Sequence, residues 1–234
     1  MSPGESKTPL TGGWVTTGVV RVGETVRRPT GSSTPFIHAL LRHLEDLGFD
    51  GAPRLLGVDE QEREILTFLD GEVPSDCRAM VWDDQQLAAV ARLLRRFHDA
   101  TAGTELAGSD EVVCHNDFGP WNLVWRQGLP AAIIDFDQAH PGERLDDLGY
   151  ALWKHLNLGL VDLAPVEQGR RIRLMSAAYG PAAAPDVLAA VERAQARMAR
   201  KIEAGTPGAG RAEAVAELNL EREWLEANQQ HLLS

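Results

Sequence analysis

The stretch that decides the fold is VCHNDFGPWNLVW, from Val113 to Trp125. It places four polar side chains, those of His115, Asn116, Asp117 and Asn122, in an apolar neighbourhood. Burying such groups costs on the order of a few kcal/mol each unless they find partners. These side chains must therefore either satisfy one another or bind something.

The residues that follow this stretch predict a β-hairpin. The segments LVW and AAII have the composition of strands, and RQGLP between them is a turn centred near residues 128 and 129. Asn122 and Asp135 are nearly equidistant from that centre, so we expect their Cβ atoms to lie about 5 Å apart at the open end. Asp117 lies on the loop that enters the same end. The open end of the hairpin thus brings together three oxygen-bearing side chains, those of Asp117, Asn122 and Asp135.

This set of side chains has the chemistry of a kinase site. Carboxylate and amide oxygens suit Mg²⁺, which typically takes one or two carboxylates together with phosphate oxygens. Asn122 and Asp135 supply such oxygens, and Asp117 can accept a proton from a hydroxyl. Kinases divide the work in the same way between a catalytic-loop aspartate, an asparagine and a later aspartate.

The motif HNDFGPWN at residues 115–122, followed by IIDFD at residues 133–137, resembles the aminoglycoside phosphotransferase family. This family is a branch of the protein-kinase-like fold. The resemblance extends over most of the chain and is strongest over residues 113–150. It implies a bilobal α+β protein with a small antiparallel-sheet lobe, a hinge and a mainly helical lobe.

The resemblance also implies a role for each motif residue. Asp117 is the catalytic base and His115 supports its loop. Asn122 and Asp135 bind Mg²⁺, and Asp147 in RLDDLGYALW braces the loop. Taken singly, each has a structural explanation, such as a core histidine or a turn residue. The two motifs at this distance together favour the nucleotide site.

The remaining patterns predict where the two lobes lie along the chain. The N-terminal nucleotide-binding lobe covers residues 1–70 and the C-terminal catalytic and substrate-binding lobe covers residues 71–234. After a flexible start over residues 1–13, we expect a hairpin of two strands at residues 15–21 and 25–28. A helix begun by Thr34 and Pro35 follows over residues 34–47, and then two strands at residues 54–58 and 64–68. In the second lobe the helices are expected over residues 83–101, 145–158, 165–179, 185–202 and 211–233.

Composition restricts the class of protein. The net charge is −11, and short basic runs such as residues 27–28 and 95–96 do not make a basic face, so a nucleic-acid partner is not expected. Two cysteines, Cys77 and Cys114, form neither a disulfide framework nor a zinc pattern. No apolar run approaches the roughly 20 residues of a membrane span, and no apolar signal core begins the chain. We expect a cytoplasmic protein without a membrane partner; nothing specifies its oligomeric state.

The first lobe departs from the kinase pattern at the cation for the ATP phosphates. Kinases use a strand lysine paired with a helix glutamate. Here the matching strand, ETVRRP, has no lysine, and Lys7 lies before the predicted sheet. Arg27 or Arg28 must take this role, and alternation along a strand lets only one of them point into the cleft. Arginine can replace the lysine because its planar fork binds phosphate through two donors, and of the two we expect Arg28 to do so.

Other parts of the nucleotide site are also altered. The helix glutamate is missing, and His38 stands near its expected place. The phosphate loop is TGGWVTTG, in which Gly12 and Gly13 allow close approach of the backbone to phosphate. The adenine is expected against the hinge, residues 67–71, bonded mainly by backbone groups.

The predicted function is transfer of the γ-phosphate of ATP or GTP to a hydroxyl of a small molecule, with Mg²⁺ as cofactor. An aminoglycoside is one candidate, because acidic residues of the C-terminal helices can bind ammonium groups, although they can equally form a solvated face. The candidates are Asp162, Glu203, Glu217 and Glu221.

Two other functions are weighed against this one. The first is a non-catalytic nucleotide-binding pseudokinase that acts as a sensor. The missing lysine and glutamate motivate it, while the presence of Asp117, Asn122 and Asp135 argues against it. A metal-dependent hydrolase is disfavoured, because His115 has no second histidine at metal-ligand spacing.

Overall fold

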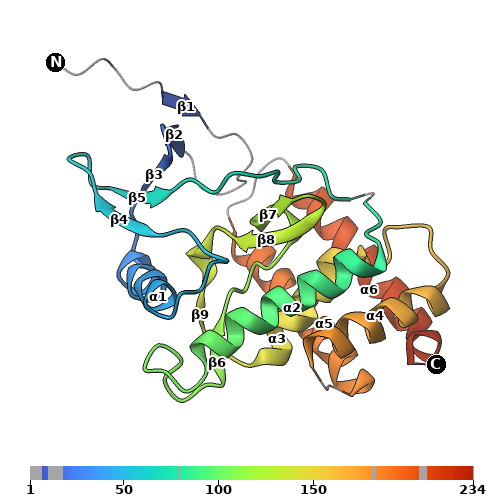
Figure 1. The fold of residues 1–234 in the computed structure, drawn as a ribbon. Helices are drawn as coiled ribbons and strands as arrows, with labels where there is room; N and C mark the ends of the chain where they lie inside the picture. The colour runs from blue at the N-terminus through green and yellow to red at the C-terminus, as the bar shows by residue number, and fades with distance from the viewer. Residues whose placement is uncertain (1–6, 10–17, 79, 181–182, 206–209, 234) are drawn as a thin grey trace.

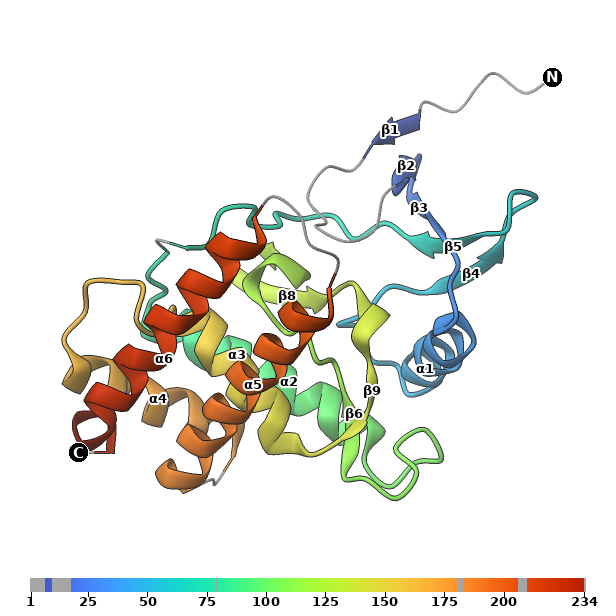
Figure 2. The ribbon, with the colours of Figure 1, turned by 180° about the vertical axis from the view of Figure 1, so that it is seen from behind.

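The structure is a computed structural model that describes residues 7–9, 18–78, 80–180, 183–205 and 210–233. Figures 1 and 2 show an antiparallel sheet and helix α1 at one end of the molecule and helices α2 to α6 at the other. Two short antiparallel strand pairs lie in the helical part. The predicted α+β class, with a small sheet and a mainly helical remainder, is confirmed.

The N-terminal sheet has the strand order β1-β2-β3-β5-β4, and every neighbouring pair is antiparallel. Its strands are β1 (Lys7–Pro9), β2 (Val20–Val22), β3 (Thr25–Pro29), β4 (Leu55–Val58) and β5 (Arg63–Thr67). The central strands β3 and β5 are in a register that sets Arg28 opposite Glu64. This pairing places a cation and an anion side by side within the sheet.

Three expectations for the start of the chain were wrong. Lys7 belongs to the sheet, because β1 pairs with β2 with Lys7 opposite Val22. The first hairpin strand, expected over residues 15–21, is the shorter β2, and residues 15–17 lie outside the described part. The following strand runs through Pro29 instead of stopping before it. The three residues of β1 are too few to show the alternation of polar and apolar residues that predicts a strand, so only pairing with β2 defines it.

Helix α1 (Thr34–Asp46) covers the sheet with an apolar face, as its sequence pattern predicts. The face is made of buried residues at helical spacing: Ile37, Leu40, Leu41 and Leu44. Leu47, expected to continue this face, is 56% exposed because the helix ends before it. The N-cap position belongs to Ser33, and Thr34 instead accepts a hydrogen bond from the backbone N–H of Gly31.

The C-terminal part is built on α2 (Asp84–Thr101), which begins with a capping box between Asp83 and Gln86. This helix packs against α4, and α3 packs against α5. The remaining helices are α3 (Arg144–Leu156), α4 (Pro165–Tyr179), α5 (Ala184–Ala204) and α6 (Arg211–Leu233). The predicted positions of these helices are confirmed to within a few residues. Among the described helices, none has both the length and the apolar content that a membrane crossing requires.

The strand pairs position the central motif. In the first, β6 (Val112–Cys114) pairs with β9 (His140–Gly142), a strand that was not predicted. In the second, β7 (Leu123–Arg126) pairs with β8 (Leu129–Ile133), which confirms the predicted hairpin. Trp125 of β7 stacks on Trp82 with ring centres 4.3 Å apart and fixes the hairpin on the helical core. The expected boundary between residues 70 and 71 lies between β5 and α2 and stays a prediction.

Candidate active site

The loop between β6 and β7 brings Asp117 and Asn122 into direct contact. Asn116 has a left-handed backbone (φ 62°), a conformation that asparagine tolerates, and a short 3₁₀ turn, η1 (Pro120–Asn122), closes the loop. Nδ2 of Asn122 then donates to the Asp117 backbone oxygen at 2.9 Å and to Oδ2 at 3.0 Å. Because these bonds use the amide nitrogen, the amide oxygen of Asn122 is the atom that can bind a cation.

The second predicted cation ligand, Asp135, lies beside this loop. It follows β8, and the backbone N–H of Ile134 donates to the Asn122 carbonyl at 2.9 Å, so Asp135 comes immediately after the last paired residue. Its backbone is left-handed (φ 63°, ψ 66°), a strained conformation that costs about 1–3 kcal/mol and is typical of functional sites. Burial raises the pKa of Asp135; the nearby Asp137 also raises it, and Arg28 opposes both.

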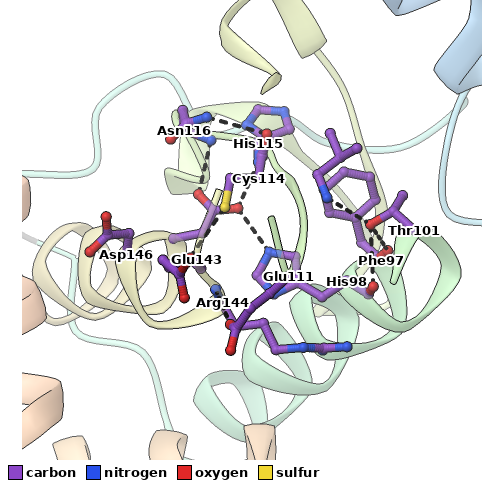
Figure 3. Close-up of polar contacts among 12 residues, drawn as sticks. Phe97, His98, Thr101, Glu111, Cys114, His115, Asn116, Glu143, Arg144 and Asp146 are labelled. Atoms are coloured by element: carbon purple, nitrogen blue, oxygen red, sulfur yellow. Dashed lines mark hydrogen bonds and ion pairs between the residues drawn. The ribbon is translucent and has the colours of Figure 1, made fainter. Parts of the chain in front are cut away.

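A buried carboxylate supports the loop, and Figure 3 labels three of the residues around it, His98, His115 and Asn116. Asp147 accepts hydrogen bonds from the backbone N–H of His115 at 2.7 Å and of Asn116 at 2.9 Å. It also contacts Nε2 of His98 at 3.1 Å. Burial alone would raise the pKa of Asp147, but the hydrogen bonds and charge of its histidine neighbours outweigh burial and lower it. Asp147 thus holds the loop backbone as an anion.

His115 and Cys114 have structural surroundings. Nε2 of His115 lies 3.1 Å from the Ile134 carbonyl, and its ring packs edge-on against Phe136. His115 therefore links the loop to the segment that carries Asp135. The Cys114 sulfur lies within 4.8 Å of ligand atoms of His98 and Asp147. Burial raises the pKa of this thiol strongly, so it stays protonated and is a poor metal ligand.

Of the two candidate arginines, Arg28 reaches the loop end. Nη2 of Arg28 lies 3.3 Å from Oδ1 of Asp135 and also bonds Asp137. Arg27 instead lies 3.8 Å from Asp59 and bonds Thr25, both within the sheet region. The alternation argument that only one neighbour points inward is thus confirmed.

Glu64 pairs with Arg28 and was missed in the sequence. Nε of Arg28 lies 3.2 Å from Oε1 of Glu64, and Nε2 of His38 lies 2.9 Å from Oε2 of the same carboxylate. The partner of the cation thus comes from the neighbouring strand, and His38 contacts that partner instead of the arginine. The available signal was alternation, because Glu64 shares the buried face of β5 with Leu66.

A cavity of about 350 Å³ opens between the sheet and the loop, and Arg28, Asn122 and Asp135 line it together. Its other walls are mostly apolar, and part of the predicted hinge belongs to them, namely Thr67, Phe68, Leu69 and Gly71. Trp121 lines the same cavity. The predicted phosphate-loop glycines, Gly12 and Gly13, lie outside the described residues. Such walls fit a ligand with a flat apolar part, and the polar end of the cavity fits a charged part of the same ligand.

Tyr150 is a second residue that sequence reasoning missed. Its hydroxyl donates to Oδ1 of Asp117 at 2.6 Å, so together with Asn122 it engages both carboxylate oxygens. Burial and the charge of Asp117 raise the pKa of Tyr150 well above its usual value, which keeps the hydroxyl protonated as a donor. Tyr150 follows Asp147 by three residues on α3, and this helical spacing was the available signal.

The four acidic residues expected in an acceptor pocket do not act together. Asp162 and Glu203 are exposed. Glu217 pairs with Arg78 at 3.1 Å, and the buried Glu221 lies 3.6 Å from Lys154. Two of the four carboxylates therefore already have cationic partners.

The residues at the polar end of the cavity fit a divalent cation with a nucleotide. The donors are oxygens, from Asn122, Asp135 and the neighbouring Asp137, which is the preference of Mg²⁺. A guanidinium already bonds Asp135 and Asp137, so this position attracts positive charge in the protein itself.

Comparison with known proteins agrees with this geometry. The model of the phosphotransferase enzyme family matches residues 82–182. The trifolitoxin immunity protein of Rhizobium leguminosarum bv. trifolii is 35% identical over 194 residues, covering 73% of each chain.

Solved structures share the fold at low sequence identity. The streptomycin–ATP complex of APH(2")-IIa has a TM-score of 0.58 at 14% identity, covering 92% of this chain and 90% of the other. APH(3'')-Id from Streptomyces rimosus, bound to ADP and streptomycin, has 0.57 at 14%, covering 92% of both. A macrolide 2'-phosphotransferase from Brachybacterium faecium has 0.56 at 15%, covering 86% and 87%. The expected bilobal kinase-like fold is confirmed.

Proposed function

The chain belongs to the phosphotransferase enzyme family, and from this premise we propose that it transfers the γ-phosphate of ATP to a hydroxyl of a small molecule with the help of Mg²⁺. The predicted enzyme class, a small-molecule O-phosphotransferase, is confirmed by this membership. One observation carries the proposal: Asp117 contacts Asn122, and Asn122 lines one cavity together with Asp135 and Arg28.

The nucleotide is proposed to lie in the cavity between the sheet and the loop. Apolar walls from the N-terminal sheet, the hinge and strand β7 suit a purine base, and Arg28 at the polar end suits phosphate. Two solved neighbours are complexes with ATP and ADP, which favours ATP over GTP here. Asn122 and Asp135 would hold Mg²⁺, which supplies neutralisation of the phosphate charge when bound.

Asp117 is proposed as the catalytic base. The acceptor oxygen bonds to the γ-phosphorus, the bond from that phosphorus to the bridging oxygen breaks, and ADP leaves. Asp117 orients the attacking hydroxyl and takes its proton. His115 and Asp147 keep the loop in place, so that most of the rate enhancement comes from positioning.

The acceptor is proposed to be a small hydroxyl compound, and aminoglycosides are one class to test because two of the solved neighbours bind streptomycin. The pseudokinase alternative loses its main motive, because Glu64 supplies Arg28 with the carboxylate partner that the helix lacks.

Calorimetric titration of ATP with and without Mg²⁺ tests the nucleotide site. Replacing Asp135 by asparagine keeps the side-chain volume and removes one anionic ligand. We expect Mg²⁺-ATP to bind this variant at least about tenfold more weakly, which corresponds to 1.4 kcal/mol. Asp162→Asn, an exposed carboxylate change, is the control and should bind as the wild type does. Equal binding with and without Mg²⁺ would contradict the proposed ligand set.

The Arg28–Glu64 pair gives a second prediction. Glu64→Gln removes the charge that orients the guanidinium, so we expect the KM for ATP to rise about fivefold to tenfold, which corresponds to about 1.0–1.4 kcal/mol. Asp59→Asn, which changes the partner of the neighbouring Arg27, is the matched control. Steady-state ADP formation measures both; a rise in KM for the Asp59 variant alone would contradict the assignment of Arg28.

A further inference from the structure

One buried lysine takes no part in the proposed mechanism. Lys154 on α3 is one of three lysines in the chain, with Lys7 and Lys201. Its side chain is 16% exposed, and its ammonium lies 3.6 Å from Oε1 of Glu221 on α6. The same ammonium lies 3.4 Å from the centre of the Trp153 ring. A cation held in this way between two helices needs an explanation.

Lys154 lies close to the proposed catalytic base. Tyr150 and Lys154 are four residues apart on α3 and therefore share one face of the helix. The Tyr150 hydroxyl bonds Asp117 at 2.6 Å. Burial lowers the pKa of Lys154, and the charges of Glu221, Glu217 and Asp117 oppose that lowering only in part. The nucleotide cavity is lined by Asn122 and Asp135 but not by Tyr150 or Lys154. Because Asp117 must meet the acceptor hydroxyl in the proposed reaction, Lys154 on this face of α3 lies near the acceptor.

The carboxylates near this face are already paired. Glu221 is 2% exposed and lies against Lys154, while Glu217, one turn earlier on α6, pairs with Arg78 at 3.1 Å. Both carboxylates are therefore partly neutralised for a polycationic acceptor. A polycationic acceptor also has to approach the ammonium of Lys154, and the repulsion between these like charges is unfavourable.

We propose that Lys154 determines acceptor specificity, and that the site prefers a hydroxyl compound with an anionic group to a polycation. An ammonium has three N–H donors, and the 3.6 Å ion pair with Glu221 is longer than a hydrogen bond. Donor capacity is thus left for a carboxylate or phosphate of the acceptor. The inference rests on the proposed function, because it concerns the acceptor of that reaction.

A matched series of probes tests this inference. Gluconate, sorbitol and glucamine share a six-carbon polyol chain and carry a negative, a neutral and a positive end. ADP formation from Mg²⁺-ATP should show kcat/KM falling in that order, with at least about tenfold between gluconate and glucamine. Lys154→Gln should bring the three values close together, and Lys154→Glu should reverse the order. Lys201→Gln removes an exposed lysine and should keep the wild-type order.

A second variant and a second measurement guard against misfolding and slow turnover. Lys154→Gln/Glu221→Gln leaves no lone buried charge, and it should also lose the preference for gluconate. Reductive ¹³C-methylation of the three lysines gives a small set of NMR signals, and the one lost in Lys154→Gln is assigned to Lys154. Gluconate should shift that signal in the ATP-bound protein, and sorbitol should not.

The outcomes separate the inference from the proposed function. A glucamine preference in the wild type, an unchanged order in Lys154→Gln, or a Lys154 signal that gluconate leaves in place would overturn the inference while phosphotransfer stands. Absence of ADP formation with every probe, despite ATP binding, would refute the proposed function; a gluconate-specific shift would then still support an anion site at Lys154.

Discussion

Replacing Asp117 by asparagine is expected to lower phosphotransfer by about 10²–10⁴-fold, the usual contribution of a positioned general base. The amide has nearly the same shape, so the contacts with Tyr150 and Asn122 can be kept, but it cannot accept the acceptor proton. ATP affinity should stay close to the wild-type value, because Asp117 does not line the nucleotide cavity. ADP formation and calorimetric ATP binding, measured on the same preparation, test both parts.

The control for this experiment is Asp110→Asn, an exposed carboxylate that precedes the same strand β6. It should leave turnover and binding unchanged. Full turnover in Asp117→Asn would remove Asp117 from its proposed role. Loss of ATP binding together with turnover would instead assign the residue to the nucleotide site.

Replacing Asp147 by alanine is expected to destabilise the protein by on the order of 3–5 kcal/mol. The change leaves two buried backbone N–H groups and His98 without their acceptor, and each unsatisfied buried group costs about 1–3 kcal/mol. Urea unfolding measures the effect. Asp146→Ala is the control: this neighbour is less buried and pairs with Arg193 and Arg197, so it should cost about 1 kcal/mol or less.

The lowered pKa of Asp147 also predicts a pH dependence. A carboxylate with a depressed folded-state pKa stabilises the protein above its unfolded pKa, about 3.9, and that stabilisation is lost as the pH falls through the lower folded value. Between neutral pH and about pH 3, the wild type should therefore lose more stability than Asp147→Ala does. Parallel losses would show that Asp147 is not held as an anion.

The sequence predicts the catalytic-loop side of the site well, because its geometry is local. Asn122 and Asp135 are placed by a hairpin whose turn and strand lengths are visible in the sequence, and the structure has that hairpin. The helices of the second part were predicted for the same reason, since their apolar periodicity extends over many turns. The roles of Asn122 and Asp135 as cation ligands stay predictions.

The missed contacts depend on pairings between distant segments. Glu64 meets Arg28 only because β3 and β5 pair in one particular register, and Tyr150 meets Asp117 only because α3 packs beneath the loop. No local pattern fixes such registers. The short strand β1 shows the same limit, because its three residues are defined by their partner strand.

Arg28 joins two halves of the site, because it contacts Glu64 in the sheet and Asp135 beside the loop, 107 residues away along the chain. A phosphate that draws the guanidinium away exposes the Asp135 carboxylate to a metal ion. A metal ion that neutralises Asp135 releases the guanidinium for phosphate in return. Each ligand thus removes a competitor of the other, and linkage requires the gain in affinity to be equal in both directions. The nucleotide and its metal ion are therefore expected to bind cooperatively, as a pair.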